Sequence, residues 1–152
     1  MQFASYLPSL IPVNDAVKNP RSHCPIAYGL DIVGDRWTLL VLRDLIIARK
    51  RHFRDLAASP EAIATNILAD RLKQLEAHGL ITRRRDPGNA RQLIYAPTAK
   101  GLDLLPMMLE LARWAASHDP ETAAPREFIC RVEQQREALI AEIRAAHEPA
   151  GN

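Results

Sequence analysis

The sequence predicts a mainly α-helical chain with one small β-hairpin, an α+β fold class. Apolar residues recur at helical spacing over most of the chain from residue 24 to residue 147. Two short β-like runs, "LITRRR" and "RQLIYA", stand on either side of a Pro-Gly turn. The 152 residues, 47% of them hydrophobic, suffice for one domain with one hydrophobic core.

The first helices are expected after an N-terminal arm. Residues 1–23 hold three prolines and no sustained periodicity, which is typical of a loosely docked arm. "CPIAYGLDIVG" then carries Pro25 in a tolerated first-turn position and Gly34 where a helix can stop. In "DRWTLLVLRDLIIA" a wide apolar stripe runs through Val41 and Leu45, which predicts a central and mostly buried helix.

A short helix is predicted in "HFRDLAA" and a longer one over residues 64–78. Leu68, Leu72 and Leu75 mark the inner face of the longer helix, and Gly79 ends it as a C-cap.

The hairpin around "DPGNA" comes next. We expect Thr98 to cap a long helix that continues to His118 and is kinked at Pro106. A last amphipathic helix is predicted over 126–147. This order contains a three-helix helix-turn-helix unit followed by a two-stranded hairpin, which is the winged helix architecture. In that architecture the second helix of the turn enters the major groove, and the hairpin reaches phosphates or the minor groove.

Charge is distributed unevenly, although the net charge is only +2. From Arg36 to Arg54 there are six Lys/Arg and one acid, and from Arg83 to Arg91 four and one. From Asp119 onward seven acids outnumber four arginines. A basic middle and an acidic tail are consistent with one face that meets a polyanion.

Four blocks occur in a characteristic order: "CPIAYGLDIVGDRWTLLVLRDL", "HFRDL", "IATNILADRLKQLEAHGLI" and "DPGNARQLIYAPTAKG". In this order and spacing the chain resembles the HxlR-type transcriptional regulators, winged helix relatives of the MarR group. The resemblance covers residues 24–118 and implies a winged helix DNA-binding domain with a dimerisation helix. Residues 1–23 and a C-terminal helical extension at 119–152 lie outside the family's common core.

The resemblance implies a homodimer that binds a roughly palindromic operator in double-stranded DNA, and a repressor is the expected role. The alternative is a winged helix protein–protein interaction module without specific DNA binding. The modest net charge is compatible with that alternative, whereas the arginines of the hairpin argue against it.

The resemblance also places the base-reading positions in the first turns of the 64–78 helix, at Thr65, Asn66, Ala69 and Asp70. An asparagine such as Asn66 can pair with adenine, and Thr65 can contact a thymine methyl group or a phosphate. Arg71 and Lys73 suit phosphates. Asp70 is repelled by phosphate, so it either reads a cytosine amine or turns toward Arg71 or Lys73. A solvated polar helix face is the alternative interpretation.

The hairpin offers the predicted wing residues Arg83, Arg84, Arg85, Asn89 and Arg91. Strand alternation puts Arg83 and Arg85 on one side and Arg84 on the other. Arg85 and Arg91 flank the turn and are the strongest phosphate or minor-groove candidates, whereas Arg84 is equally suited to pair with an acid. Upstream, "ARKRHFRDL" carries Arg49 and Lys50 and the expected DNA-backbone contacts Arg51, His52 and Arg54.

Cys24 has two interpretations. Some members of the resembled family sense electrophiles or oxidants through a cysteine at this Cys-Pro position, and a thiol near a first helical turn can react as the thiolate. Packing is the other interpretation. Cys130 has no family counterpart, and it has two interpretations, a disulfide partner or an inert helix position. A small-ligand effector is also compatible with the resemblance.

The dimer interface is expected on the broad apolar band of residues 101–118, with the 126–147 helix as a second contributor. Its predicted members are Leu105, Met108, Leu109, Ala112 and Trp114.

Other classes of protein find no support in the sequence. Neither a Cys/His metal cluster nor a catalytic motif occurs, so we expect no metal, no cofactor and no enzymatic activity. There is also no signal peptide or membrane-spanning stretch, and a cytoplasmic protein is expected.

Overall fold

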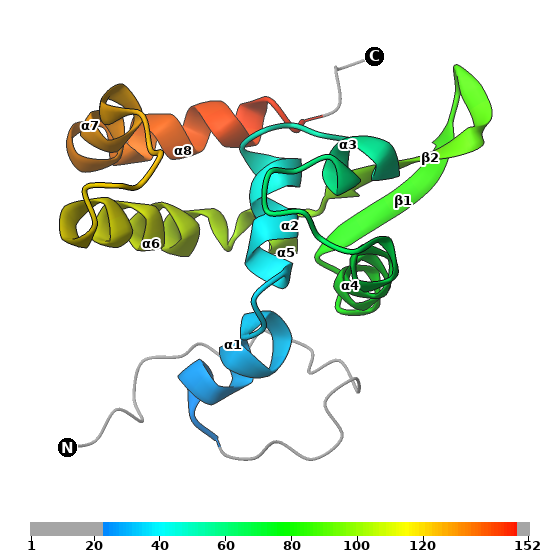
Figure 1. Ribbon diagram of the computed structural model, residues 1–152, viewed down its shortest axis with the longest axis horizontal. Helices are drawn as coiled ribbons and strands as arrows, with labels where there is room; N and C mark the ends of the chain where they lie inside the picture. Colours follow the sequence, from blue (N-terminus) through cyan, green and yellow to red (C-terminus); the bar gives the residue numbers. More distant parts are fainter. Residues whose placement is uncertain (1–22, 149–152) are drawn as a thin grey trace.

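The computed structural model describes residues 23–148, which form eight helices and one hairpin (Figure 1). The elements in chain order are α1 (Pro25–Val33), α2 (Thr38–Ile46), α3 (Phe53–Ala57), α4 (Thr65–Ala77), β1 (Ile81–Asp86), β2 (Asn89–Pro97), α5 (Ala99–Leu102), α6 (Leu105–His118), α7 (Arg126–Gln134) and α8 (Arg136–Ala145). The mainly helical fold with a hairpin is confirmed. The predicted arm at 1–23 lies outside the described residues, apart from residue 23.

Helix α2 is the centre of the fold, as its wide apolar stripe predicts. Val41, Leu42, Leu45 and Ile46 are all buried, and the helix packs against α3, α4, α6 and β2. Asp35 stands just before the helix, and its carboxylate accepts hydrogen bonds from the backbone N–H groups that open it. A helix apolar on most sides is stable only when neighbours surround it, and α2 meets that requirement.

Helix α4 has the predicted inner face, because Leu68, Leu72 and Leu75 are all buried. Gly79 follows with a φ of 68°, the left-handed conformation that ends helices at glycine. The chain can therefore turn sharply from α4 into β1.

The hairpin pairs β1 with β2 in antiparallel register, with Arg83 opposite Tyr95 and Arg85 opposite Leu93. Its other edge is joined to the helical unit, since the Tyr95 N–H donates to the carbonyl of Arg51 at 2.8 Å. The hairpin extends beyond this attachment as a projecting arm (Figure 1). The sequence therefore forms a winged helix.

Two predicted long helices are each divided in the structure. Thr98 caps α5 as expected, since its Oγ1 accepts from the Gly101 N–H at 3.1 Å, but α5 ends at Leu102. Pro106 lies in the first turn of α6 and not inside one kinked helix, because its missing N–H is tolerated only there. The predicted 126–147 helix is divided at Gln135, and no proline or glycine marks that break in the sequence.

The C-terminal extension folds back on the chain. Helix α8 lies alongside α6 (Figure 1), and Val132 and Leu139 are buried in the common core. Arg136 donates to the Glu110 carboxylate at 2.7 Å and to the carbonyl of Pro106 at 2.7 Å. Between residues 23 and 148 no helix is both long and apolar enough to cross a membrane.

Candidate nucleic-acid interface

The outward face of α4 is polar. Its exposed residues include Thr65, Asn66, Ala69, Asp70 and Lys73. Among residues 23–148, the side chains of Thr65, Asn66 and Lys73 make no hydrogen bond or ion pair. No side chain caps the helix at Ala64 either. The first turn thus presents polar side chains to an external partner.

Arg71 differs from its neighbours because it is used inside the protein. Its guanidinium lies 3.1 Å from Asp35 Oδ2 at the start of α2 and also pairs with Asp70. The hydrogen bond with Asp70 raises the pKa of Arg71, with a further contribution from Asp35. The sequence left two alternatives for Asp70, a cytosine contact or a turn toward Arg71 or Lys73, and in the structure Asp70 turns toward Arg71. These contacts fix α4 against α2.

The wing arginines fall into two groups. Arg83 Nε lies 2.9 Å from Glu76 Oε2 and so ties β1 to α4, whereas Arg84 and Arg91 make no side-chain bond within the described part of the chain. Arg85 donates to the carbonyl of Ala90 at 3.0 Å, which leaves its charge without a counter-ion.

Asn89 has a local role in the turn. Its Oδ1 accepts from the Arg91 N–H at 3.2 Å, and Asp86 Oδ1 accepts from the Gly88 N–H at 2.8 Å. In both turns a side-chain oxygen accepts a hydrogen bond from the backbone N–H two residues later, and these bonds fix the conformation of the chain at the tip of the wing.

Several of the basic side chains at residues 49–54 make contacts within the protein. Arg49 donates to the carbonyl of Ala146, and Lys50 pairs with Asp44. Arg51 and Arg54 are exposed, and their side chains have no partner within residues 23–148. Of this stretch, those two remain available to DNA phosphates.

His52, immediately before α3, connects that helix to the wing. Its Nε2 lies 2.9 Å from Asp86 Oδ2 at the end of β1, and its Nδ1 lies 3.4 Å from Asp55 Oδ2 in α3. Only the imidazolium form can donate to both carboxylates. The hydrogen bond to Asp86, assisted by the contact with Asp55, raises the pKa of His52.

We expect a proton NMR titration to give His52 a pKa above the ordinary value of about 6.5. His78 serves as the internal control, because burial and the nearby Lys100 lower its pKa. The folded-state pKa of His52 is the higher one, so its stabilising contribution is complete below about pH 6.5 and is lost as pH rises through the folded value. In His52→Gln this part of the pH dependence of unfolding should vanish. A measured pKa of His52 at or below that of His78 would contradict the contact between His52 and Asp86.

The expected dimer-interface residues do not share one surface. Leu105, Met108 and Leu109 are buried inside the chain, and Ala112 is half-buried. Trp114, in contrast, is 55% exposed. It continues an exposed apolar stripe of α6 that also contains Met107 and Leu111 at helical spacing.

The sequence interpretation overlooked a second exposed apolar surface, on α1. Ile26, Tyr28 and Leu30 are exposed there, while Val33 on the same helix is buried. Together with Met107 they line an open apolar cavity of about 500 Å³ between α1 and α6. The signal was present in "PIAYGLDIV", which is apolar on too many sides for one packing partner.

Cys24 and Cys130 are both exposed, with Cys24 at the residue that precedes α1. Cys24 therefore lies beside the first turn of a helix, as the sequence predicts.

A family model described as HxlR-like helix-turn-helix matches residues 32–123. The chain belongs to this family. The match begins within α1 and ends just beyond α6, so α7 and α8 lie outside the HxlR-like core.

Relatives of known sequence or structure agree. A helix-turn-helix transcriptional regulator from Synechocystis is 35% identical over 88 residues, which are 58% of this chain and 64% of that relative's length. The crystal structure of PA1607, described as a transcription factor candidate, superposes with a TM-score of 0.63 at 30% identity over 70% of this chain and 74% of that one. The redox regulator HypR in its oxidised form gives a TM-score of 0.54 at 27% identity, over 62% and 96% of the two chains.

These similarities confirm three expectations. The chain is an HxlR-like protein, its fold is a winged helix, and it is a transcriptional regulator of the helix-turn-helix class.

Proposed function

We propose that the chain is a homodimeric regulator that binds a roughly palindromic operator specifically and represses transcription. The observation that carries this proposal is the exposed first turn of α4, where Thr65 and Asn66 have no partner within the described residues. These side-chain types can read base edges in the major groove. Arg84, Arg85 and Arg91 would add phosphate or minor-groove contacts from the wing.

The proposed dimer uses the apolar surfaces of α1 and α6. Tyr28, Leu30, Met107, Leu111 and Trp114 are all at least 43% exposed in the single chain. Exposed apolar surface of this extent marks an interaction site, and a second copy would give the two-fold symmetry that a palindrome requires. Leu105, Met108 and Leu109 would support this surface from beneath.

Cys24 is our proposed sensor of an electrophile or oxidant, and a small ligand is the alternative effector. Its exposure next to α1 and the chain's likeness to the redox regulator HypR support the proposal. A Cys24→Ser variant should keep its DNA affinity when quinone or hypochlorite abolishes that of the parent protein. An unchanged loss of binding in the variant would exclude Cys24 as the sensor.

The proposed function is tested by titrating the protein against DNA selected from the source genome and against shuffled DNA of equal composition. We expect the selected DNA to bind at least about 10³-fold more tightly than the shuffled DNA, and both affinities to fall steeply as the salt concentration rises. Equal affinity for both would favour the alternative, a protein–protein interaction module, whose partner would use the apolar surface of α1 and α6.

A further inference from the structure

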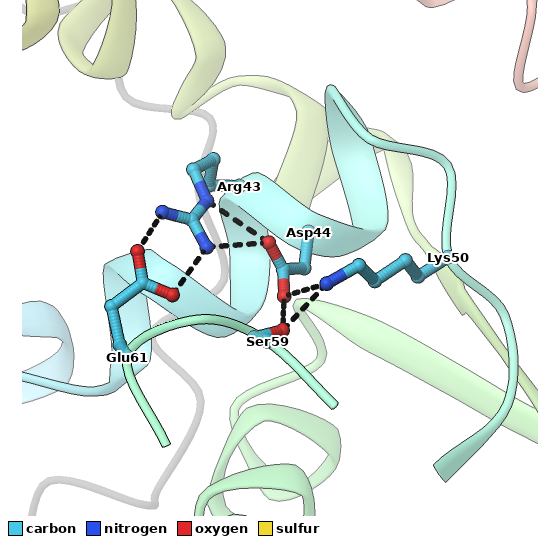
Figure 2. Close-up of polar contacts among 5 residues, drawn as sticks. All are labelled: Arg43, Asp44, Lys50, Ser59 and Glu61. Atoms are coloured by element: carbon cyan, nitrogen blue, oxygen red, sulfur yellow. Dashed lines mark hydrogen bonds and ion pairs between the residues drawn. The ribbon is translucent and has the colours of Figure 1, made fainter. Parts of the chain in front are cut away.

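A buried carboxylate on α2 contacts the chain on both sides of α3. Asp44 of α2 is only 4% exposed, and one of its oxygens accepts from Lys50 Nζ at 2.8 Å and from the hydroxyl of Ser59 (Figure 2). Lys50 precedes α3 and Ser59 follows it. One carboxylate therefore holds both ends of α3.

Arg43, the neighbour of Asp44 on α2, extends the network to the turn between α3 and α4. Its guanidinium bonds Asp44 Oδ1 at 2.7 Å and 2.9 Å, and it meets the two oxygens of Glu61 at 2.5 Å and 3.0 Å (Figure 2). The hydrogen bond from Arg43 lowers the pKa of Glu61 to about 2. Burial opposes the ionisation of Asp44, but its bonds to Lys50, Ser59 and Arg43 outweigh this and lower its pKa.

The turn held by this network has an unfavourable backbone. Ala62, next to Glu61, has a φ of 54°, a left-handed conformation that is unfavourable for a residue with a Cβ atom. Ala62 lies three residues before Thr65, where α4 begins. Contacts from α2, and not local preference, therefore stabilise the path of the chain into α4.

We propose that Arg43, Asp44 and Glu61 are positioning residues that set the orientation of α4 for base reading. This inference rests on the proposed function, because it assigns the reading to Thr65 and Asn66. Base-edge hydrogen bonds require donor–acceptor distances near 2.9 Å and good alignment, whereas phosphate contacts tolerate small shifts. Loosening the turn therefore reduces discrimination between DNA sequences more than it reduces affinity for DNA in general.

The test uses Glu61→Gln and Arg43→Lys, which keep the size or the charge of the side chain but lose the paired bonds. Glu142→Gln is the matched control, because it breaks the Arg131–Glu142 ion pair between α7 and α8. For each full-length protein, fluorescence anisotropy gives the ratio of affinities for selected and shuffled DNA. We expect this ratio to fall about 5- to 100-fold in the two network variants, with affinity for shuffled DNA within about twofold of the parent. The control should keep the parent ratio.

Amide hydrogen exchange provides a second readout that needs no DNA. Residues 58–66 should exchange faster in Glu61→Gln than in the parent, while α7 and α8 keep their protection. Unchanged exchange there, or an unchanged affinity ratio beside a discriminating parent, would overturn the positioning role. A parent that fails to discriminate would instead overturn the proposed function, and the exchange data would then decide whether the network fixes the turn.

Discussion

Replacing Arg85 and Arg91 together by alanine should weaken binding to every DNA sequence and leave the proposed dimer intact. Both arginines are exposed, and neither has an acidic partner in the described chain. If each binds one phosphate, the variant dimer lacks four phosphate interactions of about 0.5–1 kcal/mol each, or roughly 30- to 700-fold in affinity. The slope of log K against log salt should become shallower by about 0.9 for each phosphate that is no longer neutralised, or about 3.6 in total.

The control for the wing variant is Arg126→Ala/Arg131→Ala on α7, outside the HxlR-like core. It removes the same charge from each protomer, but α7 lies at the opposite end of the molecule from the hairpin (Figure 1), so the salt slope should be unchanged and the affinity should stay within about twofold of the parent. Equal reductions of affinity in both variants would show that only total charge matters. A wing variant with normal affinity would remove the wing from the interface.

Replacing Gly101 by alanine should destabilise the fold strongly. A Cβ atom at this position would lie 2.1 Å from the carbonyl oxygen of Leu80, a backbone atom that also accepts from the Thr98 N–H. The start of α5 would have to move away from the hairpin, so we expect a loss of about 3 kcal/mol in the free energy of unfolding. Urea denaturation at fixed protein concentration measures this loss.

Gly88→Ala is the matched control for Gly101→Ala. Gly88 is exposed in the turn of the wing, where an added Cβ would meet only the side chain of Asp86 at 3.4 Å. Its free energy of unfolding should stay within about 0.5 kcal/mol of the parent. Equal stability of the two variants would contradict the close approach of α5 to Leu80.

Local patterns in the sequence were sufficient to predict the elements that position the candidate interface. Leu68, Leu72 and Leu75 fall on one side of α4 because buried residues follow the helical period, and the Pro-Gly turn between two β-like runs fixes the hairpin. Gly79 follows the end of α4 because glycine adopts a left-handed backbone without strain. Thr98 precedes α5 because its hydroxyl caps the first turn of that helix. Such features depend on neighbours in the chain.

Contacts between distant segments could not be predicted in this way. Arg71 and Lys50 suit phosphate contacts by sequence pattern, but each meets a carboxylate of another element, Asp35 or Asp44. The sequence pattern predicts that a charged side chain is exposed. It does not show which acid from a distant segment the tertiary fold places beside that side chain.

The apolar band of α6 gave a similar ambiguity. Periodicity shows that the band is broad, but not which part of it faces the chain's own core. Leu105 and Leu109 face that core, whereas Leu111 and Trp114 face outward. Packing of α7 against α6 contributes to this division, and α7 lies outside the HxlR-like match.

The central claim is that Thr65 and Asn66 at the start of α4 read the operator. The most direct test is the ratio of affinities for selected and shuffled DNA, measured at one salt concentration for the parent and for Thr65→Ala/Asn66→Ala. Both side chains are exposed, so the variant should fold normally. We expect the ratio to fall about 10-fold or more while affinity for shuffled DNA changes less than about threefold. A variant that discriminates as well as the parent would contradict the claim.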